Sequence, residues 1–425
     1  MSSSCHTRSK LKHIESIPLF LNLPEEVHEE IFLRLPEKSM LISRCVCKLF
    51  YNLLSKPNFI NNHVNRTNQS KNNNRKLLCT HFSLGKHPMV YSIPIDCASI
   101  SSSSSSLSCV CDGAVLIKFP FEPKSFPSLD FLGSCNGLIC LKISSVDIAE
   151  IEKGQIVYTY YYNILNPLTR EYKEFRWPGR WYQAIYGFGY DTNNDDYKLV
   201  IISVYSCVNI DVYSVRSDSW SSIQGTVNYS FRYGGKGSRG LFFNGALHWL
   251  GSIATQGISS EVIVSFDISN GTMLNMPIPE VVMPPTEYRG GMYANVGVWG
   301  DCICIAFIWG SVRIDVWVMQ EYGVEESWIH IFATTQLPRP SYITPFWKPL
   351  WLFDNGEILV DIDGKQLLLC NPTTKTVRSV VVRDIKMDYN REIYVESIVS
   401  LGTGTYLEKQ ITHGVVKNPE QQLLR

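Results

Sequence analysis

The chain has 425 residues, of which 45% are hydrophobic and 18% are charged. Its 39 Lys and Arg residues balance its 39 Asp and Glu residues. This balance excludes a nucleic-acid or membrane-surface role that depends on bulk charge. The length favours two unequal domains, and the apolar content is enough for a large core.

Two further kinds of signal are missing from the sequence. No run of about 18 apolar residues suggests a transmembrane helix, and the first ten residues lack the apolar core of a signal peptide. We therefore expect a cytoplasmic or nuclear location.

The 13 cysteines include three Cys-x-Cys pairs but no Cys-x-x-Cys motif. We expect them to be reduced and packed as small hydrophobic side chains, with no metal site and no cofactor.

The first part of the chain has a helical pattern. Pro24 suits the first turn of a helix, and Val27, Ile31 and Leu35 follow on one face at a spacing of four residues. Pro36 ends that helix. A second short helix and a third amphipathic run up to residue 56 follow, so we predict a three-helix unit. Such a unit is too small to bury its apolar surface alone, and a second domain or a partner should cover it.

An Asn-rich stretch at residues 61–74 is typical of a polar terminus or linker. Beyond residue 77, short runs rich in Val, Ile, Tyr, Phe and Trp alternate with turn residues, which predicts β-strands. A turn before a strand recurs at a regular step. It falls at Gly137, Asn194, Gly245, Gly300 and Gly356, with steps of 57, 51, 55 and 56 residues.

Each repeat holds about four strands, and this period favours a β-propeller of five to six four-stranded blades over a β-sandwich. Five blades are readable. Residues 77–132, together with a C-terminal strand from Tyr394 to Leu401, complete a sixth blade or close the ring. The predicted fold class is α+β and mainly β.

Each repeat ends in a longer loop that is aromatic or basic and lies at the same phase, so the loops should share one rim of the ring. Tyr, Trp and Arg are enriched at protein interfaces, which favours a protein-binding rim over local packing of these side chains. The candidate target-binding residues are Trp177, Arg180, Trp181, Tyr182, Arg232, Tyr233, Tyr288, Arg289, Tyr293, Tyr342, Phe346 and Trp347. The second loop also carries Arg239.

The helical segment closely resembles the F-box motif. The resemblance rests on Leu-Pro at 23–24, Arg-Leu-Pro at 34–36, Lys-Ser at 38–39 and Arg-Cys-Val-Cys-Lys at 44–48. Phe50 stands where the family usually has Trp and keeps an aromatic anchor.

The rest of the chain is similar to the F-box-associated domain of plant F-box proteins, including the S-locus F-box group of self-incompatibility. The matching pieces include Ser134–Ile139, Asn166–Arg170, Gly187–Asp191, Asp195–Val200 and Asn244–Leu250.

These resemblances imply the substrate-recognition subunit of a Skp–cullin–F-box (SCF) ubiquitin ligase. The helices would bind a Skp-type adaptor and, through it, a cullin. The propeller would hold a protein for ubiquitination and proteasomal degradation, or an S-ribonuclease if the chain is of the S-locus type. The chain itself would act by proximity, without a catalytic residue. The adaptor-binding residues carried over are Leu23, Pro24, Val27, Ile31, Leu35, Pro36, Leu41, Cys45, Val46 and Phe50.

The expected organisation is a flexible N-terminus at 1–14, an F-box domain at 15–65, a linker at 66–76, the propeller-like domain at 77–405 and a flexible tail at 406–425. Two alternatives remain open. One is an F-box scaffold or carbohydrate-binding receptor outside ubiquitin ligases. The other is a propeller enzyme, but His248 is the only histidine clearly inside a repeated strand, where packing is the expected role.

Overall fold

The computed structural model describes residues 19–69, 75–81, 88–95, 100–101, 108–119, 128–146, 158–179, 183–203, 209–224, 229–231, 238–255, 258–280, 292–309, 313–335, 346–383, 385 and 390–402. The chain divides into two compact units, Met1–Asn65 and Arg66–Arg425. The described part of the first is called the helical unit below, and the second contains the propeller.

One short 3-10 helix and four α-helices begin the described chain. They are η1 (Leu19–Asn22), α1 (Glu25–Phe32), α2 (Glu37–Arg44), α3 (Lys48–Leu54) and α4 (Pro57–Gln69). Pro24 and Pro36 directly precede α1 and α2. Proline fits at these starts because the first turn of a helix leaves its N–H groups without helical partners.

Helix α4 differs from the predicted three-helix unit, because the Asn-rich stretch expected to be a terminus or linker is helical through Gln69. Phe59, His63 and Val64 are all buried, whereas Asn61 and the other asparagines of this segment are exposed. The buried residues lie four or five positions apart, on one face of a helix. Burial of that face outweighs the weak helix propensity of asparagine.

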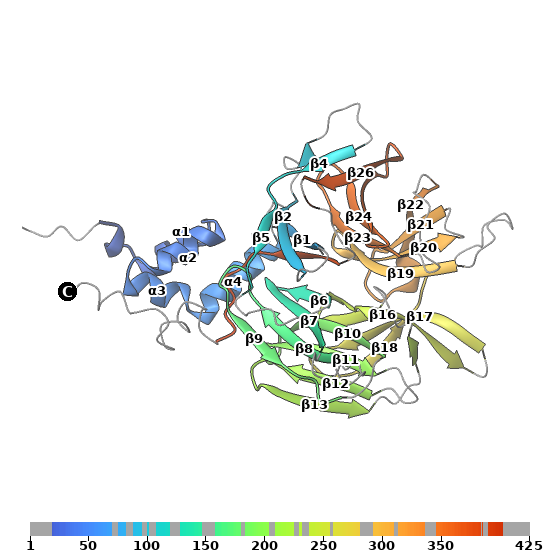
Figure 1. The fold of residues 1–425 in the computed structure, drawn as a ribbon, viewed down its shortest axis with the longest axis horizontal. Coiled ribbons are helices and arrows are strands. Elements are labelled where there is room, and N and C mark those ends of the chain that lie inside the picture. Colours follow the sequence, from blue (N-terminus) through green and yellow to red (C-terminus); the bar gives the residue numbers. More distant parts are fainter. Residues whose placement is uncertain are drawn as a thin grey trace, which may run out of the picture. The chain divides into compact units, whose positions relative to one another are not determined.

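The rest of the described chain forms a six-bladed β-propeller (Figure 1). From the axis outward, blade 1 contains β27 (Arg391–Val395), β1 (Arg75–His81), β2 (Met89–Pro94) and β5 (Val115–Ile117). Blade 2 contains β6 (Ser128–Cys135), β7 (Leu138–Val146), β8 (Tyr158–Leu165) and β9 (Tyr172–Phe175). Blade 3 contains β10 (Ala184–Asp191), β11 (Asp196–Ser203), β12 (Asn209–Ser214) and β13 (Ser219–Gln224).

Blade 4 has a divided inner strand. It contains β14 (Tyr229–Phe231) and β15 (Leu241–Phe243), both paired with β16 (Ala246–Thr255), then β17 (Ile258–Asp267) and β18 (Met273–Met276). Blade 5 contains β19 (Met292–Trp299), β20 (Cys302–Trp309), β21 (Arg313–Met319) and β22 (Trp328–Thr334), preceded by the short helix η3 (Glu325–Ser327). Blade 6 contains β23 (Trp347–Leu352), β24 (Ile358–Ile362), β25 (Gln366–Asn371) and β26 (Thr376–Val382). It is extended by β4 (Ser108–Cys111) and β3 (Ile100–Ser101).

Blade 1 closes the ring by joining distant parts of the sequence. Its innermost strand β27 pairs antiparallel with β1, with Arg75 opposite Val395 and Cys79 opposite Arg391. The sixth blade predicted from residues 77–132 and a C-terminal strand is therefore confirmed, although the strand ends at Val395. The six inner strands β27, β6, β10, β15, β19 and β23 contact one another in turn around the axis.

The repeated turns predicted from the sequence connect the first and second strands of blades 2 to 6. Asn136 and Gly137 have φ of 51° and 87°, and Asn244 and Gly245 have φ of 48° and 76°. Both pairs form the left-handed two-residue turn that matches strand twist and favours Asn-Gly. The core lies between the blades, where buried apolar side chains of neighbouring sheets pack together.

Candidate functional site

Four rings form the centre of the helical unit. Phe50 is 5% exposed, and its ring centroid lies 5.6 Å from Phe20, 5.6 Å from His28 and 5.0 Å from Phe32. The His28 Nε2 lies 2.7 Å from the carbonyl oxygen of Phe20, which ties α1 to the preceding 3-10 helix. Phe50 thus packs inside the unit and offers little surface to a partner.

Apolar side chains are unusually exposed in this unit. The propeller and helical unit together expose fifteen large hydrophobic side chains among the described residues, and seven of them fall within residues 20–51. These seven are Phe20, Leu23, Val27, Ile42, Val46, Leu49 and Tyr51, with exposed fractions from 37% to 68%. Such a concentration in a small unit is typical of a protein-interaction surface.

The residues predicted to bind the adaptor fall into three classes of burial. Leu23, Pro24, Val27, Pro36, Cys45 and Val46 are exposed. Ile31, Leu35 and Leu41 are partly buried, and Phe50 is buried. The exposed and partly buried side chains are available to a partner.

Four exposed apolar residues were not predicted as contacts: Phe20, Ile42, Leu49 and Tyr51. Ile42 is the most exposed of them, at 68%. Its position could have been inferred from Met40, which is fully buried in the same helix α2. Two residues along a helix turn the side chain by about 200°, so burial of one directs the other to solvent.

Most of the predicted target-binding rim lies outside the described residues: Arg180, Trp181, Tyr182, Arg232, Tyr233, Tyr288, Arg289 and Tyr342. Of the rest, Trp177 is partly buried and donates from Nε1 to Asp211 Oδ2 at 2.8 Å. Tyr293 is partly buried in β19, whereas Trp347 is 1% exposed within the core between blades 5 and 6. Trp347 therefore has no accessible face for a protein partner.

The second predicted loop has a different place in the repeat. It interrupts the inner strand of blade 4, between β14 and β15, whereas the other three loops join an outer strand to the next inner strand. Its last basic residue, Arg239, lines a cavity at the propeller axis, together with Phe346 of the fourth loop.

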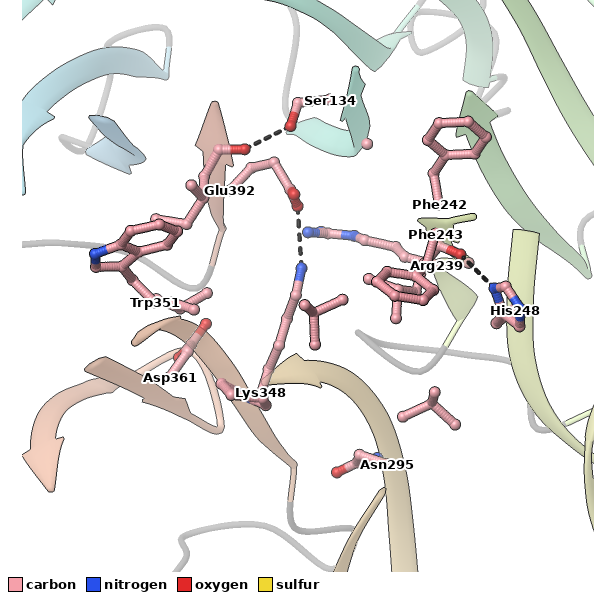
Figure 2. Close-up of a pocket in the computed structure, with 18 of the residues that line it drawn as sticks. Ser134, Arg239, Phe242, Phe243, His248, Asn295, Lys348, Trp351, Asp361 and Glu392 are labelled. Carbon is pink, nitrogen blue, oxygen red and sulfur yellow. Dashed lines mark hydrogen bonds and ion pairs between the residues drawn. The ribbon is translucent and has the colours of Figure 1, made fainter. Parts of the chain in front are cut away.

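This axial cavity has a volume of about 1260 Å³ and is lined by residues from all six blades (Figure 2). On its wall, Lys348 Nζ of β23 lies 3.2 Å from Glu392 Oε2 of β27. A second ion pair, between Arg391 and Asp361 at 2.6 Å, is almost completely buried. This grouping could not be predicted from local sequence patterns, because its members come from strands far apart in the chain.

His248 also lines the cavity wall, and its environment is that of a structural histidine. It is 1% exposed; its Nδ1 lies 3.2 Å from the Leu241 carbonyl oxygen and its Nε2 lies 2.7 Å from the Tyr322 hydroxyl. Burial lowers the pKa of His248 to about 4. The ring is thus neutral at pH 7, with one nitrogen donating and the other accepting.

The described residues offer neither a metal-binding cluster nor a membrane-spanning helix. Within the ranges given above, no three His, Cys, Asp or Glu side chains are grouped so that they could hold a metal ion. Nor is any described helix both long and apolar enough to cross a bilayer.

Comparison with known protein families matches both parts of the chain. Residues 20–62 match the F-box domain, and residues 130–406 match the F-box associated beta propeller domain. The chain is 26% identical over 405 residues to the F-box protein CPR1 of Arabidopsis thaliana, covering 89% of this chain and 88% of that protein. It is 27% identical over 391 residues to an F-box/kelch-repeat protein of the same plant, covering 89% and 96%.

Among solved structures, the chain is similar to TolB from Acinetobacter baumannii, with a TM-score of 0.38, 7% identity, and coverage of 75% of this chain and 66% of that one. This likeness is too low to support an argument about function. The family match extends over most of the propeller and is joined by a match of the helical unit. The chain belongs to the plant F-box proteins that carry an F-box associated β-propeller domain.

Proposed function

We propose that this F-box protein is the substrate-recognition subunit of an SCF-type ubiquitin ligase. The observation that carries the proposal is the group of seven exposed apolar side chains within residues 20–51, which coincides with the F-box match at residues 20–62. Water contact with this surface is unfavourable by about 25 cal/mol per Å² of apolar area, so a partner that covers it gains binding energy. The proposed partner is a Skp-type adaptor, with a cullin bound through it.

The proposed adaptor surface contains the exposed and partly buried residues carried over from the family, with Ile42 and Leu49 added. Val27 and Ile31 lie one turn apart on α1, and Ile42 precedes Val46 by the same spacing. Phe50 acts by supporting α1 and α3 from within.

The proposed role of the propeller is to hold a protein for ubiquitination. In the repeat, the loops that precede β10, β19 and β23 each enter an inner strand, and the inner strands of one propeller run in the same direction along its axis. These loops should therefore share one face. Their aromatic and basic sequence supports a protein target over a reaction catalysed by the chain. The proposed location is the cytoplasm or nucleus.

The family matches and the two Arabidopsis relatives identify F-box proteins and do not single out any one group of them. They do not favour the S-locus group, so the proposal names no S-ribonuclease as target. No feature of the described residues favours a scaffold role outside ubiquitin ligases either.

The adaptor interface can be tested with exposed valines of matched accessibility. Val46 is 66% exposed in the helical unit, and Val115 is 60% exposed in the propeller. Val46→Asp should reduce affinity for a purified plant Skp-type adaptor by about 100-fold, because burying an unpaired carboxylate opposes binding. Val115→Asp should bind like the unmodified chain. Equal binding by all three proteins would show that the proposed surface is not the adaptor site.

A further inference from the structure

The axial cavity is a feature of the propeller that adaptor binding does not explain. Its walls include apolar side chains from blades 2 to 6: Leu132, Phe188, Phe242, Trp249, Ala294 and Trp351. Pockets for small molecules usually have volumes of 300–1,000 Å³ and combine apolar walls with a few polar groups. The volume of about 1260 Å³ is large enough for such a ligand.

Arg75 lines the cavity without a direct ion-pair partner among the described residues, although the negative charge of Asp301 also acts on its guanidinium. Its guanidinium lies over the Trp351 ring, 4.0 Å from the ring centroid. Within the described residues it takes part in no ion pair and its side chain makes no hydrogen bond. Stacking uses the face of the guanidinium and leaves the N–H groups at its edge free to bind a carboxylate or phosphate. Burial lowers the pKa of Arg75, but arginine stays charged at neutral pH.

Two further cations approach the same space from other blades. Figure 2 shows Arg239 and Lys348 directed into the cavity near Glu392. Arg239 donates to the Asn390 side chain and lies 3.8 Å from Asp130, a partly exposed carboxylate that does not line the cavity. Lys348 is paired with Glu392 at 3.2 Å.

The cavity lining as a whole has four cationic and four anionic residues, but its partly buried charged side chains, called the inner wall here, carry a net positive charge. Three cations, Arg75, Arg239 and Lys348, face one anion, Glu392, so that +3 and −1 leave a net charge of +2. The Arg391–Asp361 pair cancels within itself. The two other acidic lining residues, Asp301 and Asp354, are exposed in hairpin turns at the edge, where solvent screens their charge. A positive wall with apolar surroundings concentrates anions.

We propose that the axial cavity binds a small organic anion: a molecule with a carboxylate or phosphate group that contacts Arg75 and an apolar body that packs on the aromatic wall. Arg239 of blade 4 and Lys348 of blade 6 extend the positive surface. The cavity lies between the inner strands of the ring, whereas a protein interface needs about 800 Å² of accessible surface on each partner. This geometry favours a small molecule over a folded protein.

The proposal can be tested by titration calorimetry of the full chain with probes that share one flat ring and differ in charge. Benzoate and phenyl phosphate carry an anionic group, benzamide is neutral and benzylamine is cationic. The two anions should bind with a Kd below about 1 mM, and binding should weaken with added salt. Benzamide and benzylamine should show no measurable binding.

Arg75→Gln is the decisive variant, because Arg75 has no ion-pair partner that would lose its counter-charge. It should weaken anion binding about tenfold or more, as expected for loss of a charge-assisted hydrogen bond. Arg216→Gln is the matched control: Arg216 is an exposed propeller arginine paired with Asp195 and does not line the cavity. Glu392→Gln should strengthen anion binding, since it removes the carboxylate that pairs with Lys348; this gain of affinity cannot result from misfolding.

Three outcomes would overturn the proposal. Benzamide could bind as tightly as benzoate, or Arg75→Gln could leave the affinity of both anions unchanged. Alternatively, an acidic peptide could bind in a manner that depends on Arg75 while neither small anion binds, which would assign the cavity to a side chain of the target protein. None of these results depends on whether the chain binds a Skp-type adaptor.

Discussion

The helical unit and the propeller treat their apolar side chains in opposite ways. In residues 20–51 seven large hydrophobic side chains are exposed, although Phe32, Met40 and Phe50 form a buried interior. In the propeller, the apolar side chains of neighbouring sheets cover each other around a closed ring, as in the cluster that joins blades 3 and 4. The propeller therefore completes its own core, whereas the helical unit leaves part of its apolar surface exposed, where the proposed adaptor would bind.

Of all the predicted changes, removal of the closing strand β27 should destabilise the propeller most. A chain that ends at Asn390 lacks β27, so β1 loses one of its two antiparallel neighbours, and the buried Tyr394 and Arg391 are missing. We expect the propeller to lose its cooperative thermal transition, because the ring contact between β27 and β6 is lost as well. A chain that ends at Gly402 keeps every described strand and should retain the transition in differential scanning calorimetry. A cooperative transition in both truncated chains would show that closure does not stabilise the ring.

The helical unit can be tested by separating stability from binding. Phe50→Ala should lower the free energy of unfolding of this unit by about 3–5 kcal/mol, because it removes the ring at the centre of the aromatic cluster. Val46→Ala should change that stability by less than about 0.5 kcal/mol, because the side chain is 66% exposed. Amide hydrogen exchange of residues 19–65 measures both effects. A large loss of protection in Val46→Ala would mean that this side chain supports the unit and is not reserved for a partner.

Sequence predictions were correct where neighbouring residues determine the structure, and wrong where packing against distant residues determines it. Hairpin turns are set by adjacent residues, so Asn-Gly at 136–137 and 244–245 marked the propeller repeat correctly. Helix α4 was missed because its asparagines concealed a buried face formed by Phe59, His63 and Val64. In the same way, the composition of the rim predicted an interface, but Trp347 packs in the core.

The axial cavity could not have been predicted from local pattern. Arg75, Arg239 and Lys348 lie in three separate segments, and only ring closure brings them to one space. The pairing of β26 with β4 is likewise non-local, since it places the segment that connects β2 and β5 of blade 1 in parallel beside the outer strand of blade 6. Such contacts depend on the whole topology and leave no periodic signal in either segment.

A pH titration tests the burial of His248 in the propeller. The folded pKa of His248 is about 4, below the usual value of about 6.5 that the unfolded chain should show. Between these values the unfolded state binds a proton that the folded state does not, so stability should fall as pH drops from about 6.5 to about 4. The loss attributable to His248 is at most about 3 kcal/mol. Denaturant unfolding of the unmodified chain and of His248→Gln should differ in this slope, and parallel slopes would show that His248 does not titrate differently on folding.

The smallest expected change in stability comes from substitution of two glycines at equivalent turn positions. Gly137 and Gly245 both have positive φ, 87° and 76°, so alanine is strained at either position by about 1 kcal/mol. At Gly137 an added Cβ would also lie 2.7 Å from the Ser397 Cβ and 3.0 Å from its backbone nitrogen, whereas at Gly245 no atom lies within 4 Å. Gly137→Ala should therefore lower stability by about 1–3 kcal/mol more than Gly245→Ala in thermal unfolding. Ser397 follows the closing strand β27 and donates from its Oγ to the carbonyl oxygen of Asn136, so the excess measures how firmly the closing segment is held against blade 2. Equal losses of stability in the two variants would mean that the segment of Ser397 moves away from Gly137 without loss of stability. The contact of this segment with blade 2 would then contribute nothing to closure of the ring, which β27 alone would provide.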